Sequence, residues 1–179
     1  MEKRAVISKK ICMLGSFGVG KTSLVRRFVY NTFEEKYLST IGVQISKKII
    51  TSVAKKSPIH SEQLNLILWD LAHVEKFDSV IKSYFRGSHG ALIVFDLTRA
   101  QTLRIADVFL KPYLEMNPES KLVFVGNKID QVDQAAIDVD QFLHLSDMYA
   151  TSHFFTSAKT GENVEDAFSE LAKLLLTSE

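Results

Sequence analysis

A glycine-rich segment near the N-terminus carries the residues whose chemistry is easiest to interpret. The pattern G-x-x-x-x-G-K-[ST] is met by Gly15-Ser16-Phe17-Gly18-Val19-Gly20-Lys21-Thr22. Its glycines let backbone N–H groups curl around phosphate oxygens, and a helix that starts there adds its positive dipole end. We expect Lys21 to reach the β- and γ-phosphates of a nucleotide and the Thr22 hydroxyl to bind Mg²⁺. The predicted phosphate contacts are Gly15, Phe17, Gly18, Val19, Gly20, Lys21, Thr22 and Ser23.

A carboxylate after a later apolar run is a candidate for the metal. Asp70 directly follows the strand-like stretch 64–69. Proteins with a phosphate-binding loop of this kind place an aspartate near the metal at such a strand end. An aspartate there is otherwise usually a turn residue. The assignment of Asp70 as a ligand, acting through a water molecule, therefore depends on the loop.

Two short motifs further along the chain point to the base of the nucleotide. Asn127-Lys128-Ile129-Asp130 follows an apolar run and matches the N-K-x-D motif of GTP-binding proteins. The Asp130 carboxylate can accept from both N1–H and N2–H of guanine, a pattern that adenine does not offer. Thr156-Ser157-Ala158-Lys159 resembles the S-A-K element, whose backbone N–H groups would meet guanine O6. The predicted guanine contacts are Asn127, Lys128, Asp130, Ser157, Ala158 and Lys159.

The elements that must position these motifs alternate between strands and helices. Short apolar runs predict strands at 10–14, 43–53, 64–69, 91–95, 122–125 and 153–156, with a polar hairpin loop after the second. Helical spacing of apolar residues occurs within 22–30, 103–109, 139–145 and 164–175. The alternation predicts a single three-layer α/β domain over residues 1–179, whose six-stranded sheet is mostly parallel with one antiparallel edge hairpin. Such sheets bind ligands beyond the carboxyl ends of their strands.

Composition sets limits on partners and location. The chain has 179 residues, 46% of them hydrophobic, and a net charge of +1, which gives no global field toward nucleic acid or an acidic membrane. Cys12 is the single cysteine and lies in an apolar run, as expected of a small buried residue in a reducing cytosol. No stretch is long enough for a membrane span. We therefore expect a soluble cytoplasmic protein with no nucleic-acid partner.

Taken together, the motifs resemble those of the small GTPases of the Ras superfamily, and within it the Rab family. The likeness covers nearly the whole chain. Besides the three nucleotide motifs, it includes four Rab-like segments, 39–43, 68–70, 83–90 and 158–164. The resemblance implies the P-loop fold of small G-proteins and a GTP/GDP switch with Mg²⁺ as cofactor.

Further roles follow only from this resemblance. Thr40 would give a second hydroxyl to Mg²⁺ and sense the γ-phosphate, Phe33 would lie against the guanine, and Tyr37 would close over the phosphates. Asp70 and the residues after it would form the second switch. Effector and regulatory proteins would read the two switches. Candidate contacts are Ile41, Trp69, Phe77 and Tyr84, although partial core packing explains Trp69 and Tyr84 equally well.

Three residues depart from the family pattern where hydrolysis occurs. The family has D-x-x-G-Q in switch II, whereas this sequence has Asp70-Leu71-Ala72-His73-Val74. His73 replaces the glycine that offers its N–H to the γ-phosphate, and Val74 replaces the glutamine that orients the attacking water. Phe17 puts a phenyl ring in the loop where Ras proteins have glycine. The ring would crowd the space used by that glutamine and by a partner's arginine finger.

Three functional readings remain open. In the first, hydrolysis is slow or assisted by a partner, with Lys21 stabilising charge and His73 as a candidate base, although an exposed switch residue is the favoured explanation of His73. In the second, the protein is a GTP-bound interaction module that does not hydrolyse GTP. In the third, it is a P-loop kinase or ATPase, against which the segment 127–130 argues.

Two features concern attachment and loops. Rab chains end in a flexible tail with cysteines for prenylation, whereas this sequence stops at Leu176-Thr177-Ser178-Glu179. Either a tail was removed or the protein has no lipid anchor, as would suit a prokaryotic Rab-like protein. We expect no direct membrane anchor in this chain. The stretch Lys55–Ser61 is several residues longer than in typical Rabs and is expected to extend a hairpin tip.

Overall fold

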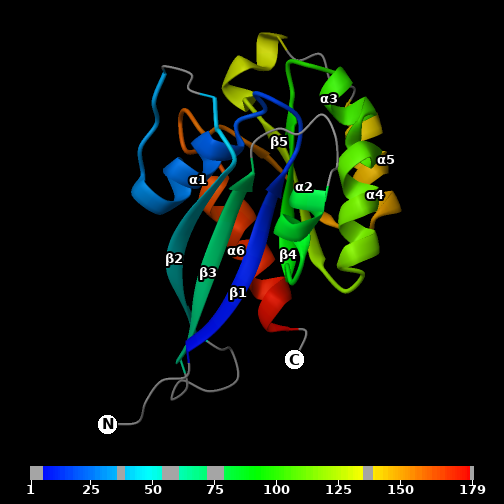
Figure 1. Cartoon of the computed structure of the whole chain (residues 1–179). Helices are drawn as coiled ribbons and strands as arrows, with labels where there is room; N and C mark the ends of the chain where they lie inside the picture. The colour runs from blue at the N-terminus through cyan, green and yellow to red at the C-terminus, as the bar shows by residue number, and fades with distance from the viewer. Residues whose placement is uncertain (1–5, 36–38, 54–60, 72–78, 135–138, 178–179) are drawn as a thin grey trace.

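Figure 1 shows a twisted sheet with helices on both faces, in a computed structural model that describes residues 6–35, 39–53, 61–71, 79–134 and 139–177. The strands are β1 (Val6–Leu14), β2 (Val43–Val53), β3 (Ser61–Leu71), β4 (Gly90–Asp96), β5 (Lys121–Asn127) and β6 (Ser152–Thr156). The helices are α1 (Lys21–Tyr30), α2 (Ser79–Phe85), α3 (Gln101–Arg104), α4 (Ala106–Met116), the 3₁₀ helix η1 (Ile129–Gln134), α5 (Val139–Met148) and α6 (Val164–Leu176).

The sheet has the predicted six strands, in the order β2-β3-β1-β4-β5-β6. β2 and β3 are antiparallel, from Val43 opposite Leu71 to Val53 opposite Ser61, and every other neighbouring pair is parallel. The prediction of a mostly parallel sheet with one antiparallel edge hairpin is therefore confirmed. Parallel strands place their carboxyl ends at one edge, where the loops after β1, β4, β5 and β6 meet.

The central strands are buried on both faces and supply two hydrophobic cores. Along β4, Leu92 and Val94 contribute to the core under α1 and α6, while Ala91, Ile93 and Phe95 contribute to the core under α4 and α5. Alternation of side chains along a strand explains this division. These are the three layers that the continuous apolar runs predicted.

The two helices on one face are locked together by an aromatic pair. The rings of Phe28 in α1 and Phe168 in α6 are stacked, with centroids 4.0 Å apart and planes only 2° from parallel. Both side chains are almost fully buried. Because α1 begins at Lys21, this contact anchors the helix that starts at the phosphate-binding loop.

Several elements differ from the sequence-based boundaries, and α2 and η1 were not predicted. β1 starts at Val6 rather than residue 10, because Val6 to Lys9 pair with β3 from Gln63 to Leu66. The pattern over 103–109 is split into α3 and α4 at Ile105, whose φ and ψ of −97° and 14° are not helical. β3 continues one residue past Asp70. Of the expected hairpin tip Lys55–Ser61, residues 55–60 lie outside the described residues, and Ser61 is the first residue of β3, opposite Val53.

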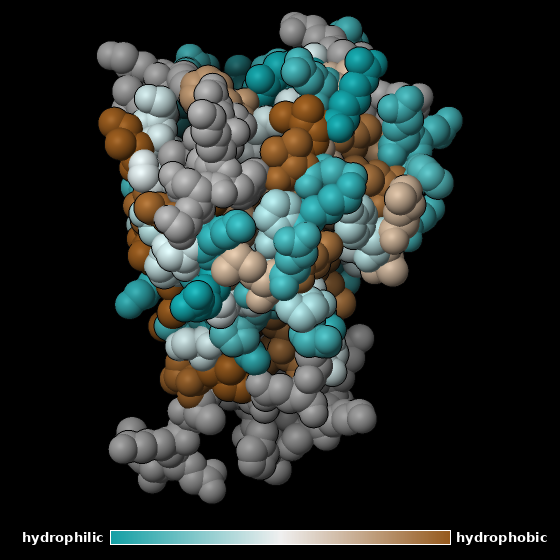
Figure 2. Space-filling model, turned by 45° about the vertical axis from the view of Figure 1, so that its right-hand side comes forward, coloured by the Kyte–Doolittle hydropathy of each residue, from teal (hydrophilic) through white to brown (hydrophobic). Residues whose placement is uncertain are grey.

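Exposed apolar side chains are spread over several elements. Figure 2 shows one face, on which hydrophobic side chains occur in separate groups between hydrophilic ones. In the part of the chain that the structure describes, no helix is both long and apolar enough to cross a membrane.

Candidate nucleotide site

The loop between β1 and α1 requires glycine at two points for different reasons. Gly20 precedes α1 with a left-handed φ of 101°, and a Cβ there would collide with the side-chain amide of Asn127. Gly15 has φ of 141°, and a Cβ there would collide with the carbonyl oxygen of Val94. A side chain at either position would push the loop away from the strands that it contacts.

Lys21 is folded back over this loop. Its Nζ donates to the carbonyl oxygens of Gly15 at 2.8 Å and Ser16 at 2.9 Å, and the residue is only 8% exposed. Burial lowers the pKa of Lys21 to about 8; the charge of Asp70 opposes this shift and that of Arg99 adds to it. A buried ammonium group with two neutral partners is a strong site for an anion.

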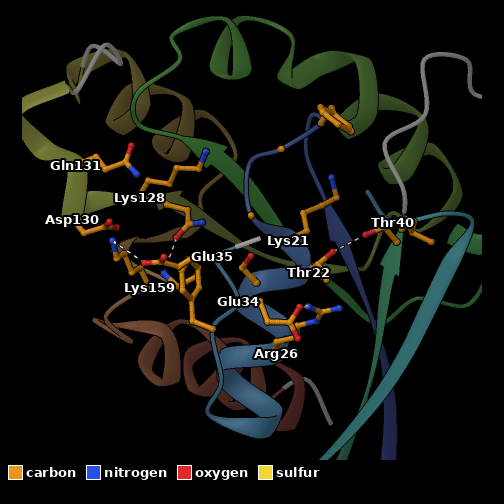
Figure 3. Close-up of a pocket in the computed structure, with 18 residues that line it drawn as sticks. Lys21, Thr22, Arg26, Glu34, Glu35, Thr40, Lys128, Asp130, Gln131 and Lys159 are labelled. Atoms are coloured by element: carbon orange, nitrogen blue, oxygen red, sulfur yellow. Dashed lines mark hydrogen bonds and ion pairs between the residues drawn. The ribbon is translucent and has the colours of Figure 1, made fainter. Parts of the chain in front are cut away.

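Three oxygen-bearing side chains meet where α1 begins. Thr22 Oγ1 lies 2.8 Å from Thr40 Oγ1 and donates to Asp70 Oδ2 at 2.5 Å; Figure 3 shows the two threonines facing each other. Asp70 is 1% exposed, and its Oδ1 has no hydrogen-bond partner among the described residues. Burial raises the pKa of Asp70, against the hydrogen bond from Thr22 and the charge of Lys21. A cation here would satisfy the orphaned oxygen and favour the ionised carboxylate.

The chemistry of these donors fits Mg²⁺. Hydroxyl and carboxylate oxygens are hard ligands, and Mg²⁺ usually takes only one or two carboxylates and completes its shell with water and phosphate oxygens. Among the described residues no three His, Cys, Asp or Glu side chains gather into a metal-binding group. The set Thr22, Thr40 and Asp70 therefore fits a cation that shares its coordination with a bound phosphate.

The predicted guanine motifs lie at the ends of β5 and β6. The carboxylate of Asp130 is exposed and its Oδ1 accepts from Ser157 Oγ at 2.6 Å. Asn127 is buried and joins the loops: Nδ2 donates to Val19, while Oδ1 accepts from Thr156 Oγ1 and Ala158 N–H. The Ala158 N–H is thus already bonded to Asn127 in this structure.

Both sets of residues line one cavity of about 250 Å³, shown in Figure 3. The predicted phosphate and switch residues that line it are Phe17, Gly18, Gly20, Lys21, Thr22, Ser23, Phe33 and Thr40. The predicted guanine residues that line it are Asn127, Lys128, Asp130, Ala158 and Lys159. Gly15, Val19 and Ser157 do not line the cavity, but they are hydrogen-bonded to Lys21, Asn127 and Asp130, which do. Tyr37, His73, Val74 and Phe77 lie outside the described residues.

The cavity also contains ion pairs that sequence patterns did not indicate. Arg26 Nη1 lies 2.5 Å from Glu34 Oε2, and Lys159 Nζ lies 3.8 Å from Glu35 Oε1. These pairs connect the segment after α1 to α1 itself and to the loop after β6. No motif marks them, because each pair depends on tertiary contact.

Arg27 is a second residue that sequence reasoning missed. Its Nε donates to the carbonyl oxygen of Ala158 at 2.9 Å and its Nη2 to that of Lys159 at 2.5 Å. The guanidinium fork matches two successive carbonyl groups, so α1 holds the loop that carries the S-A-K element. Arg27 and its two acceptors are far apart in sequence. Only the position of Arg27 on a predicted helix could have drawn attention to this residue.

Comparison with known proteins agrees with this geometry. Residues 10–177 match the model of the Ras family. The chain is 35% identical over 169 residues to the Ras-related protein Rab-1 of Theileria annulata, covering 93% of this chain and 73% of the relative. It is 35% identical over 175 residues to human Rab-27B, covering 93% and 79%, and 33% identical over 177 residues to Rab-32C of Dictyostelium discoideum, covering 96% and 75%.

The chain therefore belongs to the Ras superfamily of small GTPases. The relatives named above are Rab proteins, so it is a Rab-like member of that superfamily. The family consists of GTP-binding switch proteins, and the fold and P-loop described above are those of the family.

Proposed function

We propose that this chain binds GTP and GDP in the described cavity and acts as a nucleotide-dependent switch. One observation carries the proposal: a single cavity has Lys21 and Thr22 at one end and Asp130 and Lys159 at the other. A buried ammonium group and a helix N-terminus suit phosphates, and an exposed carboxylate suits the two N–H groups of guanine. One nucleotide would satisfy both ends.

Thr22, Thr40 and Asp70 would hold Mg²⁺, with Asp70 acting through water. The ion would neutralise charge on the β- and γ-phosphates. Thr40 comes just before β2, so its hydroxyl would tie the first switch to the nucleotide state. Loss of the γ-phosphate would release that contact and the segment after Asp70.

Effectors would read this difference at the surface near the first switch. Ile41 is 92% exposed, which suits a partner contact. Trp69 and Tyr84 are half-buried, and the Lys10 ammonium lies 3.8 Å from the Trp69 ring centroid. These two rings therefore serve the packing of the sheet face as well as any partner.

Hydrolysis is the part of this function that the sequence limits most. Val74 has no group to orient water, and His73 replaces a glycine of the switch. Phe17 is 50% exposed at the cavity wall, in the loop beside the phosphate end. Lys21 and the loop N–H groups remain to stabilise charge, so we expect slow turnover or turnover assisted by a partner. The same three substitutions favour a second candidate, a GTP-bound module without hydrolysis.

Identification of the bound nucleotide tests the proposal. The purified protein is denatured, the released nucleotide is separated by chromatography, and GTP is then followed in a single-turnover reaction with ATP as competitor. Bound GDP with measurable turnover supports the switch. GTP that does not decay supports the module. Displacement of the guanine nucleotide by ATP contradicts both. So does a protein that neither retains guanine nucleotide through purification nor binds it when it is added.

A further inference from the structure

Arg99, just after β4, links the phosphate-binding loop to a buried carboxylate. Its Nε donates to Asp96 Oδ2 at 2.8 Å, and its Nη2 donates to the backbone carbonyl of Phe17 at 2.7 Å. Among the described residues, Arg99 is not one of those that line the cavity. The guanidinium therefore contacts the loop from outside, and no motif in the sequence assigns it a role.

Asp96 gives this arginine a fixed support. The carboxylate is completely buried, and its Oδ1 accepts from Thr98 N–H at 3.0 Å and Thr98 Oγ1 at 2.7 Å. Its Oδ2 also accepts from Lys128 Nζ at 2.6 Å. Burial raises the pKa of Asp96, but the hydrogen bonds from Lys128, Thr98 and Arg99 outweigh it and hold the pKa below its usual value. An ionised, fully bonded carboxylate orients both cationic side chains.

The contact at Phe17 fixes the direction of a peptide group. The Phe17 carbonyl and the Gly18 N–H belong to one peptide unit, which is planar and trans, so they point in opposite directions. Arg99 holds the carbonyl toward the outside of the cavity, and Gly18 is part of the cavity wall. The N–H is then directed inward. Gly18 has φ of 70°, a conformation that glycine adopts at little cost.

We propose that Arg99 is a positioning residue for the nucleotide: it orients the Phe17–Gly18 peptide so that the Gly18 N–H donates to the β- and γ-phosphate oxygens. This inference rests on the proposed nucleotide-binding function. If the peptide turned over, a carbonyl oxygen would face the phosphates instead of a donor. A charged donor on the carbonyl also polarises the peptide, which strengthens its N–H as a donor. Asp96 accepts hydrogen bonds from both Arg99 and Lys128, so it connects this arrangement to the guanine motif.

A general effect of positive charge has to be separated from orientation of the peptide. The guanidinium lies close enough to Lys21 to contribute to the lowering of its pKa, after the larger effects of burial and of Asp70. Lysine at position 99 would keep the charge. A single ammonium group cannot reproduce the fork that bonds Asp96 and Phe17 together. The Arg99→Lys variant therefore distinguishes the two explanations.

The experiment compares wild type, Arg99→Ala, Arg99→Lys and the control Arg104→Ala, an exposed arginine at the end of α3. Affinities are measured for GDP and for inosine diphosphate, which lacks the 2-amino group from which Asp130 would accept a hydrogen bond. Arg99→Ala should weaken both by roughly five- to tenfold, as expected for one charge-assisted hydrogen bond, and leave their ratio within about twofold of wild type. The GDP affinity of Arg99→Lys should be closer to that of Arg99→Ala than to that of wild type. The affinity of Arg104→Ala should match that of wild type.

The amide proton of Gly18 gives a second readout. In the GDP complex, nuclear magnetic resonance should show it shifted upfield in Arg99→Ala relative to wild type, because its hydrogen bond to phosphate is weaker. Wild-type affinity from Arg99→Lys would overturn the orientation mechanism. So would an unchanged affinity in Arg99→Ala, or a changed ratio of the two nucleotides. Failure of wild type itself to bind GDP would instead refute the proposed function.

Discussion

The side-chain amide of Asn127 donates from Nδ2 to the backbone carbonyl of Val19, 2.9 Å away. Its Oδ1 accepts from Thr156 Oγ1 at 3.1 Å and from Ala158 N–H at 3.2 Å. One buried amide therefore joins the phosphate-binding loop to the loop that follows β6. The two ends of the nucleotide cavity are held in register by this side chain.

Removal of this amide should weaken both the fold and the site. Asn127→Ala leaves buried partners unsatisfied and should lower the free energy of unfolding of the nucleotide-free protein by about 2–4 kcal/mol. GDP affinity should fall as well, because the loops are no longer tied together. Urea unfolding and GDP titration measure the two effects. The control Asn65→Ala removes an exposed bond to Ser8 and should change stability by less than about 0.5 kcal/mol; equal effects would contradict the linking role.

Asp130 should act on the base without supporting the fold. Its side chain is exposed, and the one side-chain hydrogen bond described above is to Ser157. Asp130→Ala should therefore leave the melting temperature nearly unchanged. Loss of two charge-assisted hydrogen bonds should weaken GDP binding by about 100-fold or more. Asp133→Ala, an exposed aspartate in the same 3₁₀ helix, is the control. Unchanged GDP affinity in Asp130→Ala would remove this residue from the base site.

Nucleotide binding should take up a proton at Lys21. Burial lowers the pKa of Lys21 to about 8 in the free protein, and bound phosphates would raise it. Because the pKa is higher in the complex, the affinity is complete below pH 8 and falls as the pH rises through the pKa of the complex. Calorimetry in buffers of different ionisation heat should give uptake of about half a proton per GDP at pH 8 and almost none at pH 6.5. No uptake at either pH would show that free Lys21 keeps its charge.

The Thr22 hydroxyl should control metal dependence. Thr22→Ala removes a ligand and the donor to Asp70, so GDP release should accelerate and should respond less to chelation of Mg²⁺ by EDTA. Thr22→Ser keeps the hydroxyl and should behave like wild type. The measurement is dissociation of a fluorescent GDP analogue with and without EDTA. Equal EDTA responses in all three proteins would remove Thr22 from the metal site.

Restoration of the missing glutamine alone should not restore catalysis. In Val74→Gln, the ring of Phe17 is still exposed at the cavity wall and position 73 still carries histidine in place of glycine, so single-turnover hydrolysis should rise by less than about threefold. The triple change Phe17→Gly, His73→Gly, Val74→Gln should raise it further. A large gain from Val74→Gln alone would show that the valine was the only limit.

Much of the fold was predictable because its signals are local. Runs such as 91–95 are apolar enough to be buried on both faces, and the glycine loop stands between a strand and a helix. Most of the residues predicted for the two ends of the nucleotide line one cavity, although Gly15, Val19 and Ser157 do not. These features depend on neighbours in sequence, which periodicity and motifs describe well.

The connections between motifs were not predictable in the same way. Asn127 stays a predicted guanine contact, but its motif did not indicate the three side-chain bonds that it makes to other parts of the chain. The roles of Arg27 and Arg99 depend on carbonyl groups far away in sequence. A single sequence gives the donor but not the acceptor that tertiary packing brings to it.

The stacked rings of Phe28 and Phe168 also bear on how the site matures during synthesis. The phosphate-binding loop leaves the ribosome long before Phe168, the ring that packs against its helix. A nascent chain that ends before Phe168 would carry the whole glycine motif on a helix without its packing partner, and such a short helix is marginal alone. Ribosome-arrested chains of increasing length should retain labelled GDP only once α6 is free of the exit tunnel, and retention by shorter chains would show that this pairing is dispensable. The protein would then gain its ligand only after α6 has been synthesised, as one cooperative step.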